Sequence, residues 1–171
     1  MKCALLVIDV QKAIFEKKQP VYTQNHFVQN VISAVGFARQ NGIKIIFTQH
    51  ENKSFLMKGT HGYHIIDDIE VQESDMILEK KHPNIFLNTG LDDILKEAGI
   101  QSVIIAGLIS NGCVRDACLT AHKHGYEVVL LSDAHSTFYK DGIKIIEDIN
   151  CEMEAAGVVV RPVAQLPKLY G

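Results

Sequence analysis

Residues 103–131, VIIAGLISNGCVRDACLTAHKHGYEVVLL, decide the fold of this chain. The runs 103–106 and 128–131 are apolar without a polar face, which is typical of strands covered on both sides. Residues 111–124 between them predict a helix, and Gly125 is the glycine that ends it. A strand, a helix and a second strand in this order predict a parallel pair joined by a crossover helix.

The same alternation extends outward in both directions. Further strands are predicted at 3–8, 43–48, 76–79 and 158–160, and further helices between Asn25 and Gly42, at 91–98 and at 141–156. Thr89 with Asp92 resembles a capping box that opens the helix at 91–98. Residues 49–73 are polar and irregular, and they predict a long loop with one helical turn. We therefore predict an α/β fold: a three-layer, doubly wound, six-stranded and mostly parallel sheet with helices on both faces.

Composition limits the class of protein. The chain has 171 residues, which suits a single domain over 1–171, and its 47% hydrophobic and 22% charged residues are ordinary for a soluble domain. The net charge is −3 with scattered Lys and Arg, so we expect no nucleic-acid or membrane partner. The apolar run that Asp9 ends is too short for a signal peptide, and the four cysteines show no CxxC spacing. We therefore expect reduced thiols and a cytoplasmic location.

In doubly wound sheets the ligand site lies at the carboxyl ends of the strands. Asp9 ends the strand 3–8, and a partly desolvated carboxylate there suits general acid–base chemistry; an Asp that only caps the next turn is the alternative. Cys113 lies in the first turn of the helix 111–124, where unpaired N–H groups favour a thiolate and a developing oxyanion. The other cysteines are expected to be small buried hydrophobes.

The lysines and histidines are less decisive. Lys80 and Lys81 follow the strand 76–79; one of them turned inward would lower the pKa of a nearby thiol, whereas a Lys-Lys pair is usually exposed. The eight histidines form no helical HExxH motif and no cysteine–histidine framework, so we expect no metal. The chain also has no glycine-rich phosphate loop, and we expect no cofactor.

Three segments carry a family resemblance: LLVIDVQKAIF at 5–15, EKKHPNIFLNTGLDDIL at 79–95 and GLISNGCVRDACLTAHKHGYEVVLLSDAHST at 107–137. In order and spacing they resemble the isochorismatase-like cysteine hydrolase family, which includes nicotinamidases. Asp9 matches the acid–base aspartate of that family and Cys113 its nucleophile. The lysine of the family precedes an aromatic residue by six positions, and counting back from Phe86 selects Lys80.

The resemblance also implies a backbone feature and a pocket. The bond between Leu108 and Ile109 matches a non-proline cis peptide whose following N–H joins that of Cys113 in an oxyanion hole. The residues that we expect around a small-molecule substrate are Gln11, Phe15, His50 and Phe86. The family further suggests a homo-oligomer.

The implied reaction is acyl transfer to Cys113. Asp9 takes the thiol proton, the thiolate attacks a carboxamide, and the thioester is then hydrolysed, with Lys80 holding Asp9 and favouring the thiolate. Metal-dependent nicotinamidases carry Asp-x-His after the second strand, where this chain has 50–52, His-Glu-Asn. Isochorismatases proper cleave a vinyl ether without a nucleophilic cysteine, so Cys113 argues against that reaction.

Two alternatives remain. The first is a hydrolase of the same fold that acts on a ureido, carbamoyl or thioester group. The second is a non-catalytic, redox-responsive α/β protein in which Cys113 is merely oxidisable.

Overall fold

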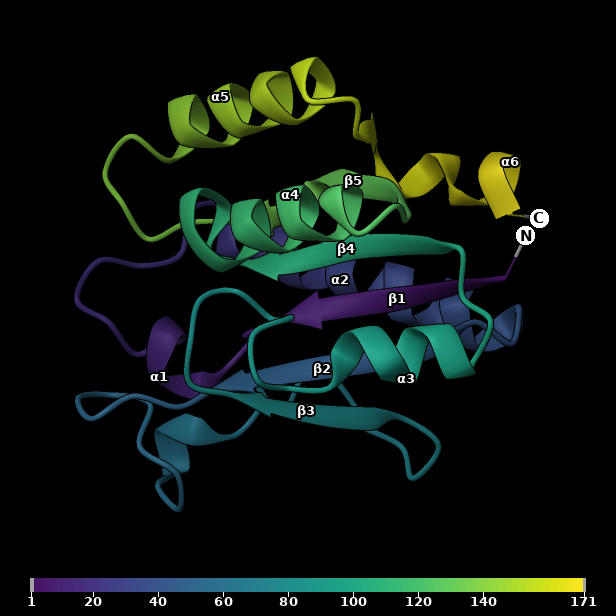
Figure 1. Ribbon diagram of the computed structural model, residues 1–171. Coiled ribbons are helices and arrows are strands. Elements are labelled where there is room, and N and C mark those ends of the chain that lie inside the picture. The colour runs from purple at the N-terminus through teal and green to yellow at the C-terminus, as the bar shows by residue number, and fades with distance from the viewer. Residues whose placement is uncertain (1, 171) are drawn as a thin grey trace.

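The computed structural model describes residues 2–170 as one six-stranded sheet with helices on both faces (Figure 1). The strands are β1 (Cys3–Ile8), β2 (Lys44–His50), β3 (Met76–Lys80), β4 (Ser102–Leu108), β5 (Glu127–Ser136) and β6 (Val159–Arg161). They lie in the order β3-β2-β1-β4-β5-β6, and every neighbouring pair is parallel. The predicted doubly wound sheet is confirmed, and its strands are parallel throughout.

The helices bury the two faces of the sheet separately. One face is covered by α1 (Lys12–Phe15), α2 (Gln24–Gln40) and α6 (Leu166–Tyr170), and the other by α3 (Leu91–Glu97), α4 (Arg115–Lys123) and α5 (Gly142–Ala155). All of β1 is buried because successive side chains enter opposite cores: Leu5 packs with α2, and Leu6 packs with α3 and α4. The three-layer prediction is therefore confirmed. Within residues 2–170, none of the helices has the length and apolar character needed to cross a membrane.

The segment after β4 differs from the prediction. Residues Ser110–Val114 form a wide turn, η2, in which Asn111 and Gly112 have non-helical backbone angles, and α4 begins only at Arg115. A single helix over 111–124 is therefore wrong, because apolar periodicity does not reveal the geometry of a turn that adjoins a helix. β5 also continues past its predicted end at Leu131 to Ser136.

The helix predicted at 91–98 does begin at Leu91, but the caps predicted for α2 and α3 are wrong. α3 follows Gly90, and Thr89 accepts the N–H of Leu91 through its hydroxyl instead of forming a capping box with Asp92. α2 begins at Gln24, before the predicted cap Asn25. The single helical turn predicted in the long loop 49–73 is the 3-10 turn η1 (His61–Tyr63). A second 3-10 turn, η3 (Val163–Gln165), lies after β6 and leads into α6.

The strand order reverses between β1 and β4, and this reversal locates the site. In an open parallel sheet, connections leave in opposite directions at such a point, which opens a crevice at the carboxyl ends of the two strands. Asp9 directly follows β1, and Cys113 lies in the turn that follows β4. Both residues therefore lie at the topological switch point.

Gly107 lets β1 and β4 approach closely at this edge. Its φ is +125°, and a Cβ atom there would lie 2.1 Å from the carbonyl oxygen of Ile8. We expect Gly107→Ala to lower the free energy of unfolding by about 3–5 kcal/mol, because the methyl group both clashes with backbone and opposes this φ.

Gly36→Ala is the matched control for that substitution. Gly36 lies inside α2, and a Cβ atom there meets nothing within 4 Å. Helix propensity then predicts a gain of up to about 1 kcal/mol. Urea unfolding measures both variants, and a loss at Gly107 no larger than the change at Gly36 would contradict the prediction.

Candidate active site

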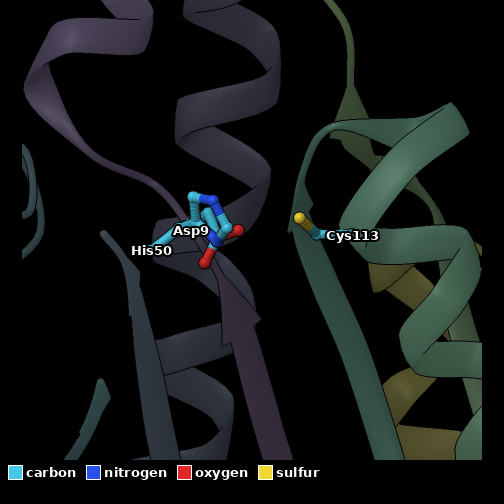
Figure 2. Close-up of side chains that lie close together, drawn as sticks. All are labelled: Asp9, His50 and Cys113. Carbon is cyan, nitrogen blue, oxygen red and sulfur yellow. The ribbon is translucent and has the colours of Figure 1, made fainter. Parts of the chain in front are cut away.

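The side chains of Asp9, Lys80 and Cys113 meet at the carboxyl edge of the sheet. Nζ of Lys80 lies 2.8 Å from Oδ2 of Asp9 and 3.3 Å from Sγ of Cys113. Figure 2 shows the sulfur of Cys113 pointing from the turn after β4 toward Asp9 and His50. The structure thus brings together three residues that the sequence singled out on separate strand ends.

Asp9 is held in place by its backbone and by Thr48. Its φ is +48°, a left-handed conformation that is unusual for a residue with a side chain and is found where the surroundings enforce it. The Thr48 hydroxyl accepts the N–H of Asp9 at 3.0 Å and donates to its Oδ1 at 2.5 Å. Because Oδ2 contacts Lys80, both carboxylate oxygens are fixed in a residue that is only 2% exposed.

The inward lysine is Lys80. β3 ends on it, one residue beyond the predicted strand, and adjacent residues of a strand point to opposite sides. The side chain of Lys80 is 0% exposed, whereas that of Lys81 is 74% exposed and lies 3.7 Å from Glu51. The residues alone left this choice open, and the resemblance selected the same lysine.

Cys113 keeps its proton in the resting site. Burial raises the pKa of its thiol to about 12; the charge of Asp9 adds to the rise, and the ammonium of Lys80 offsets part of it. The prediction of a resting thiolate is therefore wrong. The sulfur lies in η2 rather than at the start of a regular helix, and it faces a carboxylate within 4.8 Å. A thiol in this state needs a base to react, and Asp9 is close enough to serve.

The turn that carries Cys113 is built around Ile109. The N–H groups of Gly112 and Val114 both donate to the carbonyl of Ile109, at 3.0 and 3.3 Å, so they fix the backbone on either side of the cysteine. The peptide between Leu108 and Ile109 is cis, as the resemblance implied. The oxyanion hole that goes with it stays a prediction.

A buried polar chain also holds this turn, and the sequence reasoning missed it. His135 is 2% exposed; its Nδ1 lies 2.8 Å from the hydroxyl of Ser110 and its Nε2 lies 2.9 Å from Oδ1 of Asn150. Because Asn150 donates its Nδ2 to Ser132, its Oδ1 must accept, so Nε2 of His135 carries the hydrogen and Nδ1 accepts from Ser110. Burial lowers the pKa of His135, which keeps the ring neutral. The signal for it was the polar end of the segment 132–136, directly after an apolar strand.

We expect His135→Ala to lower the free energy of unfolding by about 2–4 kcal/mol, because the buried Ser110 and the partly buried Asn150 would be left without their partner. His122→Ala is the matched control, since His122 lies on the exposed side of α4 and should cost less than about 0.5 kcal/mol. Guanidinium unfolding measures both. Equal losses for the two variants would show that the polar chain does not hold the turn.

His50 joins the three residues, and Gln11 holds His50. Nδ1 of His50 lies 3.1 Å from Nζ of Lys80. The fully buried Gln11 donates its amide to the carbonyls of His50 and Tyr63, at 3.1 and 2.8 Å, and accepts the N–H of His50 at 2.8 Å. Both N–H groups of Gln11 are thus used by backbone, so Gln11 positions His50, and its predicted contact with a substrate stays a prediction.

The two aromatic residues expected in the substrate pocket, Phe15 and Phe86, both stack on other aromatic side chains. Phe15 stacks on Phe27 with ring centroids 6.4 Å apart and lines a cavity of about 170 Å³ beside α2. Phe86 stacks on His124 at 4.9 Å and on Tyr126 at 6.2 Å. A contact of either ring with a substrate stays a prediction.

Metal-ligating side chains also gather here. Within residues 2–170, the ligand atoms of Asp9, His50 and Cys113 all lie within 4.8 Å of one another. Glu51, the neighbour of His50 in the sequence, does not belong to this group.

Known proteins match this chain over most of its length. An uncharacterized isochorismatase family protein of Bacillus subtilis, YddQ, is 29% identical over 142 residues, which are 80% of this chain and 79% of that protein. Nicotinamidase 3 of Arabidopsis thaliana is 27% identical over 154 residues, 81% of this chain and 75% of that protein. Ureidoacrylate amidohydrolase RutB of Rhizobium rhizogenes is 30% identical over 122 residues, 68% of this chain but 50% of that protein.

A solved structure and a family model also match this chain. An isochorismatase-like hydrolase from Alkaliphilus metalliredigens superposes with a TM-score of 0.90 at 25% identity, over 100% of both chains. The family model of the isochorismatase domain matches residues 3–146, which include the whole of the Asp9, Lys80 and Cys113 cluster. The chain therefore belongs to the isochorismatase family of hydrolases.

Proposed function

We propose that this hydrolase cleaves the C–N bond of a small carboxamide through a thioester on Cys113. One observation carries the proposal: a buried ammonium, that of Lys80, lies 2.8 Å from a fixed carboxylate and 3.3 Å from a cysteine sulfur. A nucleophile, a base and a positive charge at these distances are the parts that acyl transfer requires.

The first half of the reaction forms the thioester. Asp9 accepts the proton of the Cys113 thiol as the sulfur attacks the carbonyl carbon, and the charge of Lys80 stabilises the thiolate as it forms. The N–H groups of Ile109 and Cys113 hold the oxygen of the tetrahedral intermediate. Asp9 then gives its proton to the leaving nitrogen, ammonia departs and an acyl group remains on the sulfur.

The second half releases the acid. Asp9 takes a proton from a water molecule whose oxygen attacks the thioester carbon. The carbon–sulfur bond breaks, the carboxylic acid leaves, and the proton returns to Cys113. Each turnover thus consumes one water and restores the thiol that the raised pKa of Cys113 favours at rest.

His50 is proposed to orient the substrate. Burial and the charge of Lys80 lower the pKa of His50, so its ring is neutral. Since Nδ1 faces the Lys80 ammonium at 3.1 Å and accepts from it, the hydrogen lies on Nε2. That N–H suits a carbonyl or carboxylate oxygen of a substrate.

Ureido and carbamoyl groups are the second candidates. They share the carbonyl flanked by nitrogen, and the relatives of this chain include both a nicotinamidase and a ureidoacrylate amidohydrolase. Zinc-dependent recognition of nicotinamide is not favoured, because His50 and Asn52 stand where the Asp and the His of the Asp-x-His motif would fall.

Ammonia release from a panel of small carboxamides, ureides and carbamates, with thiol release measured for thioesters, tests the proposal. We expect at least one carboxamide to be turned over and its acyl group to be found by mass spectrometry on the peptide that carries Cys113. Cys151→Ser, at an exposed cysteine, is the matched control and should keep both turnover and adduct. Absence of turnover and of any adduct, together with ready oxidation of Cys113 by peroxide, would favour the redox-responsive alternative.

A further inference from the structure

The ammonium nitrogen of Lys80 lies among four acceptor atoms. Nζ is 2.8 Å from Oδ2 of Asp9, 3.1 Å from Nδ1 of His50, 3.2 Å from the carbonyl oxygen of His82 and 3.3 Å from Sγ of Cys113. An ammonium has only three hydrogens, so it cannot bond all four at once. A carboxylate oxygen, an imidazole nitrogen and a cysteine sulfur around one point are, however, the ligands that zinc and similar ions take in proteins.

We propose that Lys80 occupies a latent binding site for a divalent metal of the zinc type, whose ligands are Asp9, His50 and Cys113. The three ligand atoms lie within 4.8 Å of one another and come from separate elements around a common centre. Zinc bonds to oxygen, nitrogen and sulfur are about 2.0–2.3 Å long, so each ligand would move inward by about 1 Å. The carbonyl of His82 or a water molecule supplies the fourth position.

The charge count explains why the ammonium and a metal exclude each other. A divalent ion is balanced by the Asp9 carboxylate and a Cys113 thiolate, whose proton is released to solvent on binding. Lys80 places a positive charge at the same point, where its side chain is 0% exposed and held beside Asp9. In the wild-type protein the lysine therefore keeps the sulfur free for chemistry when zinc is present. This inference rests on the geometry and does not depend on the proposed function.

Replacing Lys80 by Ala should open the site. We expect Lys80→Ala to bind Zn²⁺ and Co²⁺ at least about a hundredfold more tightly than the wild-type protein, because the repelling charge is removed while the ligands remain. The Co²⁺ form should show the visible absorption of a tetrahedral ion and a near-ultraviolet band from sulfur to metal. Lys81→Ala, which removes the exposed neighbouring lysine, is the matched control and should bind no better than wild type.

Further variants assign the ligands. In the Lys80→Ala background, Cys113→Ser should remove the sulfur band, and His50→Ala should weaken binding of both ions by about tenfold or more. If Lys80→Ala folds only when Zn²⁺ is added, that too supports the site, and Lys80→Ser offers a small polar side chain beside Asp9 for the same titration. Wild-type affinity equal to that of Lys80→Ala, a sulfur band that survives Cys113→Ser, or two folded variants without enhanced binding would each overturn the proposal.

Discussion

Replacing Cys113 by Ala is expected to reduce the kcat of amide hydrolysis by about four orders of magnitude or more, without unfolding the protein. The variant has no atom that can carry the acyl group, and the remaining groups can at best polarise the substrate. Cys113 is only partly buried at the margin of the core beneath α4, so loss of its sulfur should change the melting temperature little. Steady-state kinetics with the best amide of the panel, together with thermal unfolding, measures both effects.

Two further variants serve as controls for Cys113→Ala. Cys151→Ala removes a cysteine of α5 that is exposed, so its predicted burial is wrong, and this variant should keep the full rate. Cys113→Ser keeps a hydroxyl at the same position, and its rate should stay near that of Cys113→Ala, because Asp9 deprotonates a hydroxyl far less readily than a thiol. A rate for Cys113→Ala within tenfold of wild type would eliminate the thioester mechanism.

Asp9→Asn is expected to change two readouts in opposite directions. Hydrolysis should fall by about a thousandfold, because the base that accepts the thiol proton is gone. Alkylation of Cys113 by iodoacetamide at neutral pH should instead become about tenfold faster or more, since each unit by which a thiol pKa falls multiplies its thiolate fraction tenfold. The reason is electrostatic: the charge of Asp9 raises the pKa of Cys113, so an uncharged amide lets Lys80 lower it.

The pH profile of alkylation shows whether the charge of Asp9 raises or lowers the pKa of Cys113. In the wild-type protein the pKa of Cys113 is about 12, so the alkylation rate should go on rising through pH 9 without a plateau. In Asp9→Asn the curve should level off at lower pH. Lys80→Met is the control: it removes the charge that lowers the pKa, so alkylation should be slower than in wild type. Unchanged alkylation in both variants would mean that neither charge acts on the sulfur.

Much of the active site followed from the position of residues at strand ends. Asp9 and Cys113 were found because each follows a fully apolar strand, and parallel strands bring their carboxyl ends to one edge. Gly107 shows the limit of such reasoning. Nothing in its sequence context reveals that a Cβ would meet the backbone of Ile8, because that contact joins two strands far apart in the chain.

The buried polar chain that holds the turn of Cys113 could not be predicted from the sequence, for a related reason. Ser110 bonds His135, which lies 25 positions further along, and His135 in turn bonds Asn150, 15 positions beyond it, and no periodic pattern pairs them. The capping box predicted at Thr89 failed because Gly90 gave the backbone a different entry into α3. Local patterns predict local structure only where the tertiary contacts agree with them.

The sequence by itself determined the three-layer parallel sheet and two members of the cluster of Asp9, Lys80 and Cys113, since both depend on the order of apolar runs along the chain. Only the tertiary structure showed Lys80 buried, Lys81 exposed and Gln11 bonded to the backbone of His50, and only its burial and charges raise the pKa of Cys113. Each of these properties depends on burial, hydrogen bonds and charges contributed together by β1, β2, β3 and the turn after β4. They are therefore fixed only when the strands lie side by side in the folded protein.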